Sequence, residues 1–451
     1  MKIAVPSDVE KIIEKLTSSG YKAYAVGGCV RDSIMGKTPH DWDICTSARP
    51  EEILASLDTH NIIESGLKHG TVTVKVDGEL YEITTFRSEG EYKDNRRPES
   101  VEFITSLKED LSRRDFTVNA MAYNSFDGLC DYFNGTEDIE NKIIRCVGDP
   151  DKRFSEDALR IMRALRFASK LGFEIEENTK AALRRNARLL KNISVERIAA
   201  ELVQILDGEY AEQILLDYTD VLGVFIPEIL PMVGLEQRNP HHSFDVWTHT
   251  VYVIVNSPHG RIMRLSALLH DIAKPRCFTV DERGTGHFHG HPEVGAKMAG
   301  KILRRLHFDN DTINKASTLI RYHDQRPKLE AKYVRRLIAK TGAENFLPLL
   351  DLKRADAKGQ NPVTVPDKLK YIDELEKMFT ELTADGSEFN IKTLKLTGSD
   401  LMDLGVSQGR EIGYWLKEML DRVIEGKIQN DKKALLNEVN RLIEEKKRNE
   451  M

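Results

Sequence analysis

The 451-residue sequence is too long for one hydrophobic core and predicts about three or four domains. Charged residues make up 31% of it and hydrophobic residues 40%, as in globular proteins that fold in water. No apolar run approaches the roughly 18 residues of a membrane span, so no membrane partner is expected. Five scattered cysteines without a C-x-x-C spacing, together with an amphipathic N-terminal segment, favour a reducing, cytoplasmic location.

The stretch from Lys152 to Arg197 is basic, in contrast to the rest of the chain. It holds twelve Lys or Arg and six Asp or Glu, a net charge of +6; because the whole chain carries −6, the remainder carries −12. Such a basic stretch is often only the solvated face of helices. Beside a site that handles phosphates, it would instead indicate a polyanionic partner.

The first 150 residues alternate short strands and helices, which predicts an α+β domain. In chain order, we expect a strand at 24–26, a helical turn at 31–35, a strand at 42–44, a helix beginning at Pro50 and a β-hairpin at 71–86. The hairpin is indicated by alternate valines in TVTVKV, an Asp-Gly turn and the strand pattern of LYEITTF. Residues 88–100 show no periodicity and predict a mobile loop.

The remaining residues predict three helical domains of different composition. Residues 151–232 place Leu, Ile and Ala at spacings of three and four, which predicts an all-α neck and body. Eight of the thirteen histidines fall between His241 and His291, so residues 233–360 are expected to form a separate domain. Residues 361–451 follow the Pro-containing segment QNPVTVPD and end in a charged amphipathic helix, which predicts a helical tail.

The stretch YAVGGCVRDSIMGKTPHDWDICTS combines a glycine pair with two aspartates. Gly27 and Gly28 follow a predicted strand and precede Arg31, an arrangement that lets N–H groups and a guanidinium approach phosphates. Asp41 and Asp43 are two apart, so on a strand their carboxylates would share one side and suit Mg²⁺. An ordinary turn and an exposed acidic strand end explain the same residues, and both interpretations stay open.

Two further segments supply candidates for the same site. Glu82, in the strand YEITTF, is the candidate for a third metal-binding carboxylate, although a solvent-facing Glu explains it nearly as well. In LSRRDFTVNAMAY, Arg114, Asp115 and Asn119 suit a ribose and a triphosphate, because carboxylates accept hydrogen bonds from hydroxyls and guanidinium groups bind phosphates. A salt-bridged turn is the alternative.

The segment EDALRIMRALRF lies within the basic stretch. Its charged residues recur every three positions, so on a regular helix they would share one broad face: Asp157, Arg160, Arg163 and Arg166. Asp and Arg together offer donors and acceptors for the Watson–Crick edges of bases. A face of i,i+3 ion pairs fits the pattern equally well.

Taken in order, these segments resemble one known family. GGCVRD, HDWDICTS, FRSEGEYKDNRRPESVEF, KEDLSRRDFTVNAMAYN, DGLCDYFNGTEDIENKIIRCVGDP, RFSEDALRIMRALRFA and ISVERIAAEL closely resemble the motifs of class II tRNA nucleotidyltransferases, the CCA-adding enzymes and their bacterial poly(A) polymerase relatives. The resemblance runs from about residue 20 to residue 205, and its motifs are specific in combination. It implies a polymerase-β-like nucleotidyltransferase head with a small mixed sheet and helices, followed by an all-α neck and body and a helical tail.

The resemblance implies nucleotidyl transfer in the head. The 3′-hydroxyl of a tRNA would attack the α-phosphate of CTP or ATP and release pyrophosphate, with Mg²⁺ bound by Asp41 and Asp43. Gly28 and Arg31 match contacts to the nucleotide phosphates. The basic stretch would contact the acceptor stem through its backbone and shape, because A-form grooves resist direct readout of bases.

Other matched positions concern the choice of sugar and base. Arg114 and Asp115 match a motif that senses the ribose. Four residues of EDALRIMRALRF match nucleotide-selecting positions: Asp157 and Arg160 the amino-acid template that pairs with C or A, and Arg163 and Arg166 nearby contacts. Residues 88–100 match the loop associated with switching from C to A addition. Because this loop retains Asp94 and Arg97, the resemblance favours complete CCA addition over addition of CC alone.

The histidine-rich segment gives a second candidate site. His270 and Asp271 are adjacent at the end of an apolar helix, where imidazole and carboxylate suit a divalent ion. The segment resembles the HD phosphohydrolase superfamily, whose metal ligands are matched by His249, His270, Asp271 and Asp356; His291 and His323 match extra histidines of some members, and His287 and His289 match none. The resemblance implies a divalent metal such as Mg, Mn or Ni and a phosphohydrolase activity on RNA 3′ ends, although HD folds also persist as scaffolds.

The predicted function is therefore template-independent addition of CCA to tRNA 3′ ends, with tRNA, CTP and ATP as partners and no DNA. A poly(A) polymerase or an A-adding tRNA nucleotidyltransferase is the alternative with the same chemistry. A phosphohydrolase whose head only binds RNA is an alternative of another class, and the intact D-x-D pair argues against it. A non-catalytic tRNA chaperone would not require those carboxylates.

Overall fold

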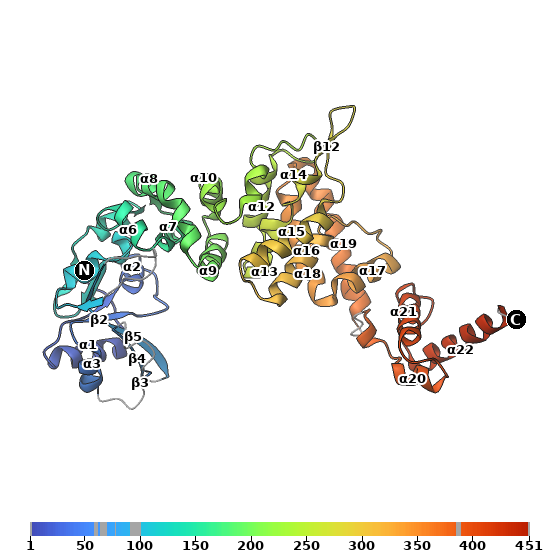
Figure 1. Cartoon of the computed structure of the whole chain (residues 1–451), viewed down its shortest axis with the longest axis horizontal. Coiled ribbons are helices and arrows are strands. Elements are labelled where there is room, and N and C mark those ends of the chain that lie inside the picture. Colours follow the sequence, from blue (N-terminus) through green and yellow to red (C-terminus); the bar gives the residue numbers. More distant parts are fainter. Residues whose placement is uncertain are drawn as a thin grey trace. The chain divides into compact units, whose positions relative to one another are not determined.

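The chain folds into two compact units, Met1–Pro227 and Glu228–Met451. The computed structural model describes residues 2–57, 62–63, 70–76, 78–90, 101–384 and 389–449. Figure 1 shows strands and helices together in the blue part of the chain and helices predominating from residue 150 onward. Among the described residues, no helix combines the length and the apolar character that crossing a bilayer requires. The finer division into four domains stays a prediction.

A mixed sheet forms the centre of the first unit. Its strands lie in the order β3-β4-β5-β2-β1-β8-β9. Their bounds are β1 (Ala23–Val26), β2 (Ile44–Thr46), β3 (Ile62–Ile63), β4 (Thr71–Val76), β5 (Glu79–Thr85), β8 (Met121–Asn124) and β9 (Gly128–Asp131). β2 and β5 run parallel, whereas the other neighbours in this order are antiparallel. The small mixed sheet and the hairpin formed by β4 and β5 are confirmed.

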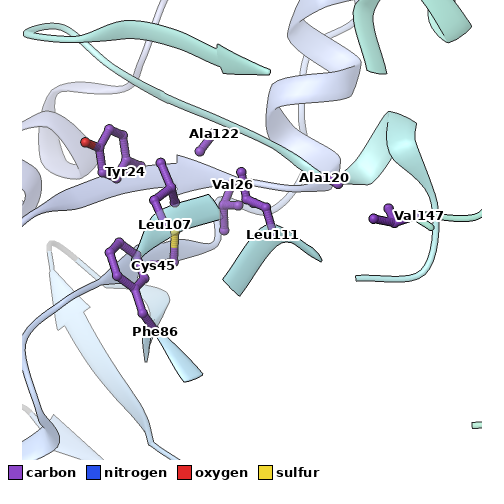
Figure 2. Close-up of a cluster of buried hydrophobic side chains, with 9 residues drawn as sticks. All are labelled: Tyr24, Val26, Cys45, Phe86, Leu107, Leu111, Ala120, Ala122 and Val147. Carbon is purple, nitrogen blue, oxygen red and sulfur yellow. The ribbon is translucent and has the colours of Figure 1, made fainter. Parts of the chain in front are cut away.

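A hydrophobic cluster fixes the central strands of this sheet. Figure 2 shows side chains from β1, β2, β8 and helix α4 (Leu107–Ser112) in one cluster with residues from the connecting segments. Its members are at most 5% exposed: Tyr24, Val26, Cys45, Phe86, Leu107, Leu111, Ala120, Ala122 and Val147. Burial of apolar surface contributes roughly 25 cal/mol per Å², so the cluster holds β1 and β2 together. The segment that follows β1 and the segment that precedes β2 are therefore anchored to packed strands.

Two predicted boundaries in the sheet region are wrong. The strand expected at 42–44 is β2, so Asp41 and Asp43 precede the strand instead of lying on it. All three residues of β2 are buried, whereas the two aspartates are exposed, and charged groups favour the position outside the buried ladder. Residues 88–89, expected in a loop, belong to β6 (Arg87–Glu89), which pairs with β7 (Val101–Phe103). The rest of that predicted loop, 91–100, lies outside the described residues.

Helices complete the first unit. Beside the sheet lie α1 (Ser7–Ser18), α2 (Gly28–Ile34) and α3 (Pro50–Leu57), the last beginning at Pro50 as predicted. The region predicted to be all-α contains one short strand, β11 (Glu174–Ile175), which pairs with β10 (Ile143–Ile144). Its helices are α6 (Pro150–Glu156), α7 (Leu159–Leu171), α8 (Glu177–Asn186), α9 (Val195–Leu206), α10 (Ala211–Asp217) and α11 (Thr219–Leu222). The apolar side chains of α7, among them Met162 and Leu165, are buried, and α7 packs against α9.

In the residues that the structure describes, the second unit is helical apart from one short β-hairpin. Its N-terminal elements are α12 (Val246–Asn256), α13 (Arg261–Leu269), α14 (Lys274–Cys277), β12 (Thr279–Val280), β13 (Gly286–His287), α15 (His291–Arg305), α16 (Asn310–Tyr322), α17 (Ala331–Thr341) and α18 (Ala343–Lys358). Helix α12 packs on α13 and α18, and α16 packs on α13, α15 and α18. These contacts bring the histidines of distant sequence segments to one place.

The C-terminal part of the second unit has its own hydrophobic core. Its helices are α19 (Val365–Thr383), α20 (Gly398–Asp403), α21 (Arg410–Ile424) and α22 (Lys432–Asn449). Trp415 and Met419 of α21 pack with Leu435 and Val439 of α22 in this core. The predicted linker QNPVTVPD is a short 3-10 turn, Pro362–Thr364, followed directly by α19.

Candidate functional site

The end of the central sheet brings the glycine pair and the two aspartates together. β1 pairs with β2 through Ala25 opposite Ile44, and the N–H of Val26 donates to the carbonyl oxygen of Asp43 at 2.9 Å. The turn after β1 and the segment before β2 therefore lie at the same edge. Gly27 has a φ of +83°, and a Cβ there would lie 3.1 Å from Nη1 of Arg114. This close approach explains why a glycine occupies the turn.

Three carboxylates lie near one another at this edge. β2 and β5 run parallel with Ile44 beside Ile83, which puts Glu82 level with Asp43. Desolvation by the surrounding protein raises the pKa of Asp43, although part of that residue reaches solvent. Arg114 opposes this rise, and the negative charges of Glu82 and Asp41 add to it. Carboxylates that repel one another in this way are stabilised by a divalent cation, so the donor set fits Mg²⁺.

A cavity of about 580 Å³ opens beside these carboxylates. The predicted residues that line it are Gly27, Gly28, Arg31, Asp41, Asp43, Arg114, Asp115, Asn119, Arg163 and Arg166. The volume and the basic lining suit a nucleoside triphosphate. Lys37, His40, Phe167 and Lys170 also line the cavity and were not predicted. Two of them, Lys37 and His40, lie in the same quoted stretch as the aspartates, where their polar side chains were the available signal.

A buried network joins the glycine turn to α7. Nη1 of Arg31 donates to Oδ1 of Asn119 at 2.6 Å, and Nδ2 of Asn119 donates to Oδ1 of Asp115 at 3.3 Å. Nε of Arg163 donates to Oδ2 of Asp115 at 2.7 Å. Burial would raise the pKa of Asp115, but the charge and hydrogen bond of Arg163 outweigh it and lower that pKa to about 2. Asp115 is therefore ionised at neutral pH and holds Arg163 at the cavity.

Phe167 contacts three of the cavity's guanidinium groups. Their central carbons lie 5.2 Å (Arg31), 5.4 Å (Arg163) and 4.5 Å (Arg166) from the centroid of its ring. The negative face of an aromatic ring attracts such cations and reduces the repulsion among them. Arg166 is also paired with Glu201 at 3.2 Å. The wall of the cavity is therefore a fixed arrangement of positive groups.

Asp157 and Arg160 are not brought to the cavity lining. Asp157 caps α6 and precedes α7, so the prediction that it shares a helical face with the three arginines is wrong. Its Oδ1 accepts from the N–H of Leu159 at 3.0 Å, which competes with regular helix at this position. Its Oδ2 pairs with Arg197 at 2.9 Å. Arg160 is buried and pairs with Glu156 at 2.7 Å, the ion-pair alternative for this segment.

Asp94 and Arg97, predicted to act in the switch from C to A addition, lie outside the described residues.

Arg160 makes two further hydrogen bonds, from Nη1 to the carbonyl oxygen of Arg153 at 3.0 Å and from Nη2 to that of Arg113 at 2.9 Å. The two template candidates are thus held by neighbours within the protein. A nucleotide base would have to replace some of these bonds.

The second unit gathers the predicted histidines around Asp271. His249 comes from α12, His270 and His323 end α13 and α16, and His291 begins α15. Their Nε2 atoms lie near its two oxygens: His270 at 3.1 Å and His249 at 3.4 Å from Oδ2, and His291 at 3.3 Å and His323 at 3.8 Å from Oδ1. Asp356 Oδ1 lies 3.1 Å from Nε2 of His249. All six predicted ligands are therefore together.

Each histidine of this cluster is oriented through its other ring nitrogen. The Nδ1 atoms lie 2.7–3.0 Å from backbone carbonyl oxygens, of Gly359 for His249, Ala267 for His270, Phe288 for His291 and Ile320 for His323. A carbonyl oxygen only accepts, so each neutral ring carries its proton on Nδ1 and has a lone pair on Nε2. This is the tautomer of a metal-binding histidine with its supporting hydrogen bond.

The cluster forms two sets of candidate ligands that share Asp271. The Nε2 atoms of His249 and His270 lie 3.3 Å apart, as do those of His291 and His323. Lone pairs at that distance repel unless a cation lies between them. Neither oxygen of Asp271 accepts a well-directed hydrogen bond, although Nζ of Lys274 lies 2.7 Å from Oδ2. Within the described residues, each pair of histidines forms with Asp271 a group whose ligand atoms lie within 4.8 Å of one another. The donors fit one or two divalent ions.

Family models match three segments of the chain. One described as "Poly A polymerase head domain" matches residues 23–145, and one described as "Probable RNA and SrmB- binding site of polymerase A" matches residues 172–232. A third, "tRNA nucleotidyltransferase domain 2 putative", matches residues 292–439. The first match contains the sheet and the carboxylates of the candidate site, and the second contains the end of the basic stretch.

Similar proteins cover nearly the whole chain. A CCA-adding enzyme of Geobacillus stearothermophilus is 35% identical over 94% of this chain and 94% of its own length. A CCA-adding enzyme of Lactobacillus helveticus (strain DPC 4571) is 48% identical, over 52% of this chain and 58% of its own. The crystal structure of Bacillus stearothermophilus CCA-adding enzyme in complex with CTP has a TM-score of 0.71 at 30% identity, covering 98% of this chain and all of that one. The chain therefore belongs to the CCA-adding enzymes, which are nucleotidyltransferases.

Proposed function

We propose that this chain adds C, C and A in that order to the 3′ ends of tRNAs, using CTP and ATP and releasing pyrophosphate. The observation that carries the proposal is the edge of the sheet where the glycine turn, Asp41 and Asp43 meet an arginine-lined cavity. The relatives named above are CCA-adding enzymes, and one of them was crystallised with CTP. Five free thiols suit action in a reducing compartment, which we take to be the cytoplasm.

In this proposal Asp41, Asp43 and Glu82 hold Mg²⁺ at the head. Bound there, Mg²⁺ would make the tRNA 3′-hydroxyl more acidic and neutralise charge on the transferred phosphate. The protein's own contribution is to position the nucleotide: Gly27 and Gly28 line the cavity without side chains in the way, and Arg31 and the other guanidinium groups bind the phosphates. The triphosphate replaces water beside groups that are already fixed, so little reorganisation is needed during transfer.

Recognition of the sugar uses residues that line the cavity, and recognition of the base uses residues outside its lining. Asp115 and Asn119 offer hydrogen-bonding groups to the ribose, and both line the cavity. Asp157 and Arg160 read the base after exchanging their bonds to Arg197 and Glu156 for bonds to C or A. The resemblance assigns Asp94 and Arg97 to the change from C to A addition. These roles remain proposals.

The basic stretch would bind the tRNA backbone. Its helices α8 and α9 carry charged groups that face solvent, including Arg184 and Arg185. Contacts to phosphates carry no base sequence, which suits an enzyme that acts on many tRNAs. We expect binding to weaken steeply as the salt concentration rises.

One experiment separates complete CCA addition from the alternatives. tRNAs that end before CCA, after C and after CC are each incubated with CTP, ATP or both, and the products are resolved at single-nucleotide length. Ordered addition of C, C and A that then stops supports the proposal. Addition of A alone, or of A without limit, would identify an A-adding enzyme or a poly(A) polymerase. The absence of any incorporation would contradict nucleotidyl transfer.

The buried cluster around Asp271 favours a second function, metal-dependent phosphohydrolysis at RNA 3′ ends. Metal binding requires neutral imidazoles with a free Nε2, and the hydrogen bonds from each Nδ1 to a backbone carbonyl oxygen provide this tautomer. Mg, Mn and Ni are the candidate ions. A bound ion would supply an activated water and polarise a phosphate ester. Metal analysis of the purified chain, followed by assays on a 2′,3′-cyclic phosphate and a terminal phosphate, tests this function.

A further inference from the structure

Two cavities meet at the histidine cluster of the second unit. The larger, of about 580 Å³, lies between the segment 239–242, the β12–β13 hairpin and the cluster. The smaller, of about 230 Å³, lies against α18 and α19. Both are lined by the same five residues: His323, Asp324, Arg326, Asp356 and Gln360. The histidine cluster therefore adjoins both cavities, and the residues that the two linings share form the junction between them.

The two cavities have walls that suit organic groups. The larger one is lined by Phe288 and by His287 and His289, whose rings are stacked with centroids 5.3 Å apart and planes 8° apart. The smaller one is lined by Ile372 and by Tyr371, whose hydroxyl donates to the carbonyl oxygen of Pro327 at 2.6 Å. Planar and aliphatic surfaces of this kind bind sugar or base moieties by contact area.

A guanidinium group stands at the junction. Arg326 is exposed, lines both cavities and makes no ion pair with any residue that the structure describes. Lys353 and Lys368 line the smaller cavity, but both ammonium groups already donate hydrogen bonds, Lys353 to the carbonyl oxygens of His323 and Gln325 and Lys368 to Oε1 of Gln360. Of these three cations, Arg326 is therefore the one available for a ligand, and its planar donors match a phosphate.

We propose that the second site takes a linear phosphodiester, with one organic group in each cavity, the phosphate at the histidine cluster, and Arg326 as its phosphate-binding side chain. This proposal rests on the phosphohydrolase function proposed above. A phosphate monoester has one organic group, and a 2′,3′-cyclic phosphate has both ester oxygens on one ribose, so either would fill only one cavity. An internucleotide linkage fills both.

The reaction is hydrolysis and needs no reactant besides water. A new P–O bond forms to the oxygen of water, and the P–O bond to one of the two organic groups breaks. That group leaves as an alcohol after taking a proton, and the other keeps the phosphate as a monoester. The number of bonds to phosphorus and the electron count are unchanged, so no oxidant or reductant takes part.

The first test compares two ester classes in the manganese-loaded full chain. Bis(4-nitrophenyl) phosphate is the diester and 4-nitrophenyl phosphate the monoester. We expect kcat/KM to favour the diester by about tenfold or more, and Arg326→Ala to lower the diester value by about ten- to a hundredfold through loss of a charge-assisted contact. Arg321→Ala is the matched control, because Arg321 is paired with Glu293 and lines neither cavity. Equal values for the two esters, or equal effects of the two substitutions, would overturn the proposal.

The second test blocks the smaller cavity and does not depend on turnover. Asp367 is exposed at its rim, so Asp367→Trp adds bulk there and Asp367→Asn changes only the charge. Calorimetry measures binding of a phosphorothioate-linked dinucleotide and of a mononucleotide, with CTP present to occupy the head. We expect the wild-type chain and Asp367→Asn to bind the dinucleotide about tenfold more tightly, and Asp367→Trp to lose that preference. Equal affinities in the wild-type chain would overturn the proposal.

The outcomes of these tests also distinguish the two-sided diester site from the phosphohydrolase function on which it rests. A chain that retains no metal and hydrolyses neither ester contradicts the phosphohydrolase function itself. A chain that binds metal and hydrolyses the monoester or the cyclic phosphate alone supports that function and overturns the two-sided site. Preference for the diester in both tests supports both.

Discussion

The two candidate metal sites of this chain differ in how their ligands are held. In the head, Asp41 and Asp43 are exposed at a cavity, and the charges around Asp43 oppose one another. In the second unit, four histidines and Asp271 are buried, and each histidine is oriented by a backbone carbonyl. The first arrangement suits ions that arrive with a nucleotide, and the second suits an ion that stays. We therefore expect the exposed head site to take up its ions with the nucleotide and the buried site to keep its ion.

Asp43→Asn should break the head site and leave the second one intact. In the proposed function Asp43 binds the catalytic ions, and loss of such a carboxylate costs several kcal/mol in the transition state. We therefore expect CTP incorporation to fall roughly a thousandfold or more. Single-turnover incorporation into tRNA measures the effect, and the metal content of the chain should not change. Asp8→Asn is the control, because Asp8 lies on α1 and pairs only with surface groups. A loss below tenfold would remove Asp43 from the metal site.

Asp271→Asn should impair the second site and leave the head site intact. Asp271 is shared by both sets of histidines, so its loss should weaken metal retention by more than about a hundredfold, beyond the effect of a supporting residue. Because a ligand that binds only the folded state stabilises it, Mn²⁺ should raise the Tm of the wild-type chain and not that of the variant. Asp311→Asn, at an exposed position of α16, is the control. Equal metal retention in both variants would contradict a resident ion.

The sequence predicted both sites but not their geometry. Ligand types and order in the chain indicated Asp41, Asp43 and the pair His270–Asp271, because those features are local. The strand predicted at 42–44 begins two residues later, at Ile44, because the buried residues form the ladder. Asp157, expected on the helix, lies two residues before α7 and caps it through the N–H of Leu159. Contacts between distant segments, such as the pair of Arg163 with Asp115, 48 positions apart, leave no periodic signal in the sequence.

The pair of Asp115 and Arg163 permits a test of electrostatics in the head alone. Arg163 lowers the pKa of Asp115 from the usual 3.8 to about 2 against the effect of burial. A lowered pKa contributes stability above the unfolded value, and this contribution is lost as the pH falls through the folded value. We expect Asp115→Asn to reduce the free energy of unfolding by about 2 kcal/mol above pH ~4 and by progressively less toward pH ~2. Urea unfolding of the wild-type chain and the variant across this range measures it; a difference independent of pH would contradict the ion pair.

Substitution of Phe167 should have the smallest effect on activity, and it tests how the charged groups of the head are held compared with those of the second unit. In the second unit the histidines are oriented by backbone carbonyl groups. In the head, Arg31, Arg163 and Arg166 all contact the ring of Phe167. Phe167→Leu keeps an apolar side chain but removes the ring, and each contact of this kind contributes about 0.5–1 kcal/mol. In the proposed function the guanidinium groups bind the phosphates both before and during transfer. We therefore expect KM for CTP and ATP to rise about three- to tenfold with kcat nearly unchanged.

The split between KM and kcat decides what the ring does. If Phe167 only fills space, Phe167→Leu should lower thermal stability and leave KM unchanged, since leucine restores most of the apolar volume. If the ring holds the guanidinium groups for the incoming phosphates, Phe167→Tyr should retain wild-type KM while Phe167→Leu does not, because tyrosine keeps an aromatic face. Equal KM values for all three chains would mean that polar partners position the arginines: Asp32, Asp115, Asn119 and Glu201. The head would then resemble the second unit, with its charged groups fixed by hydrogen bonds from the protein.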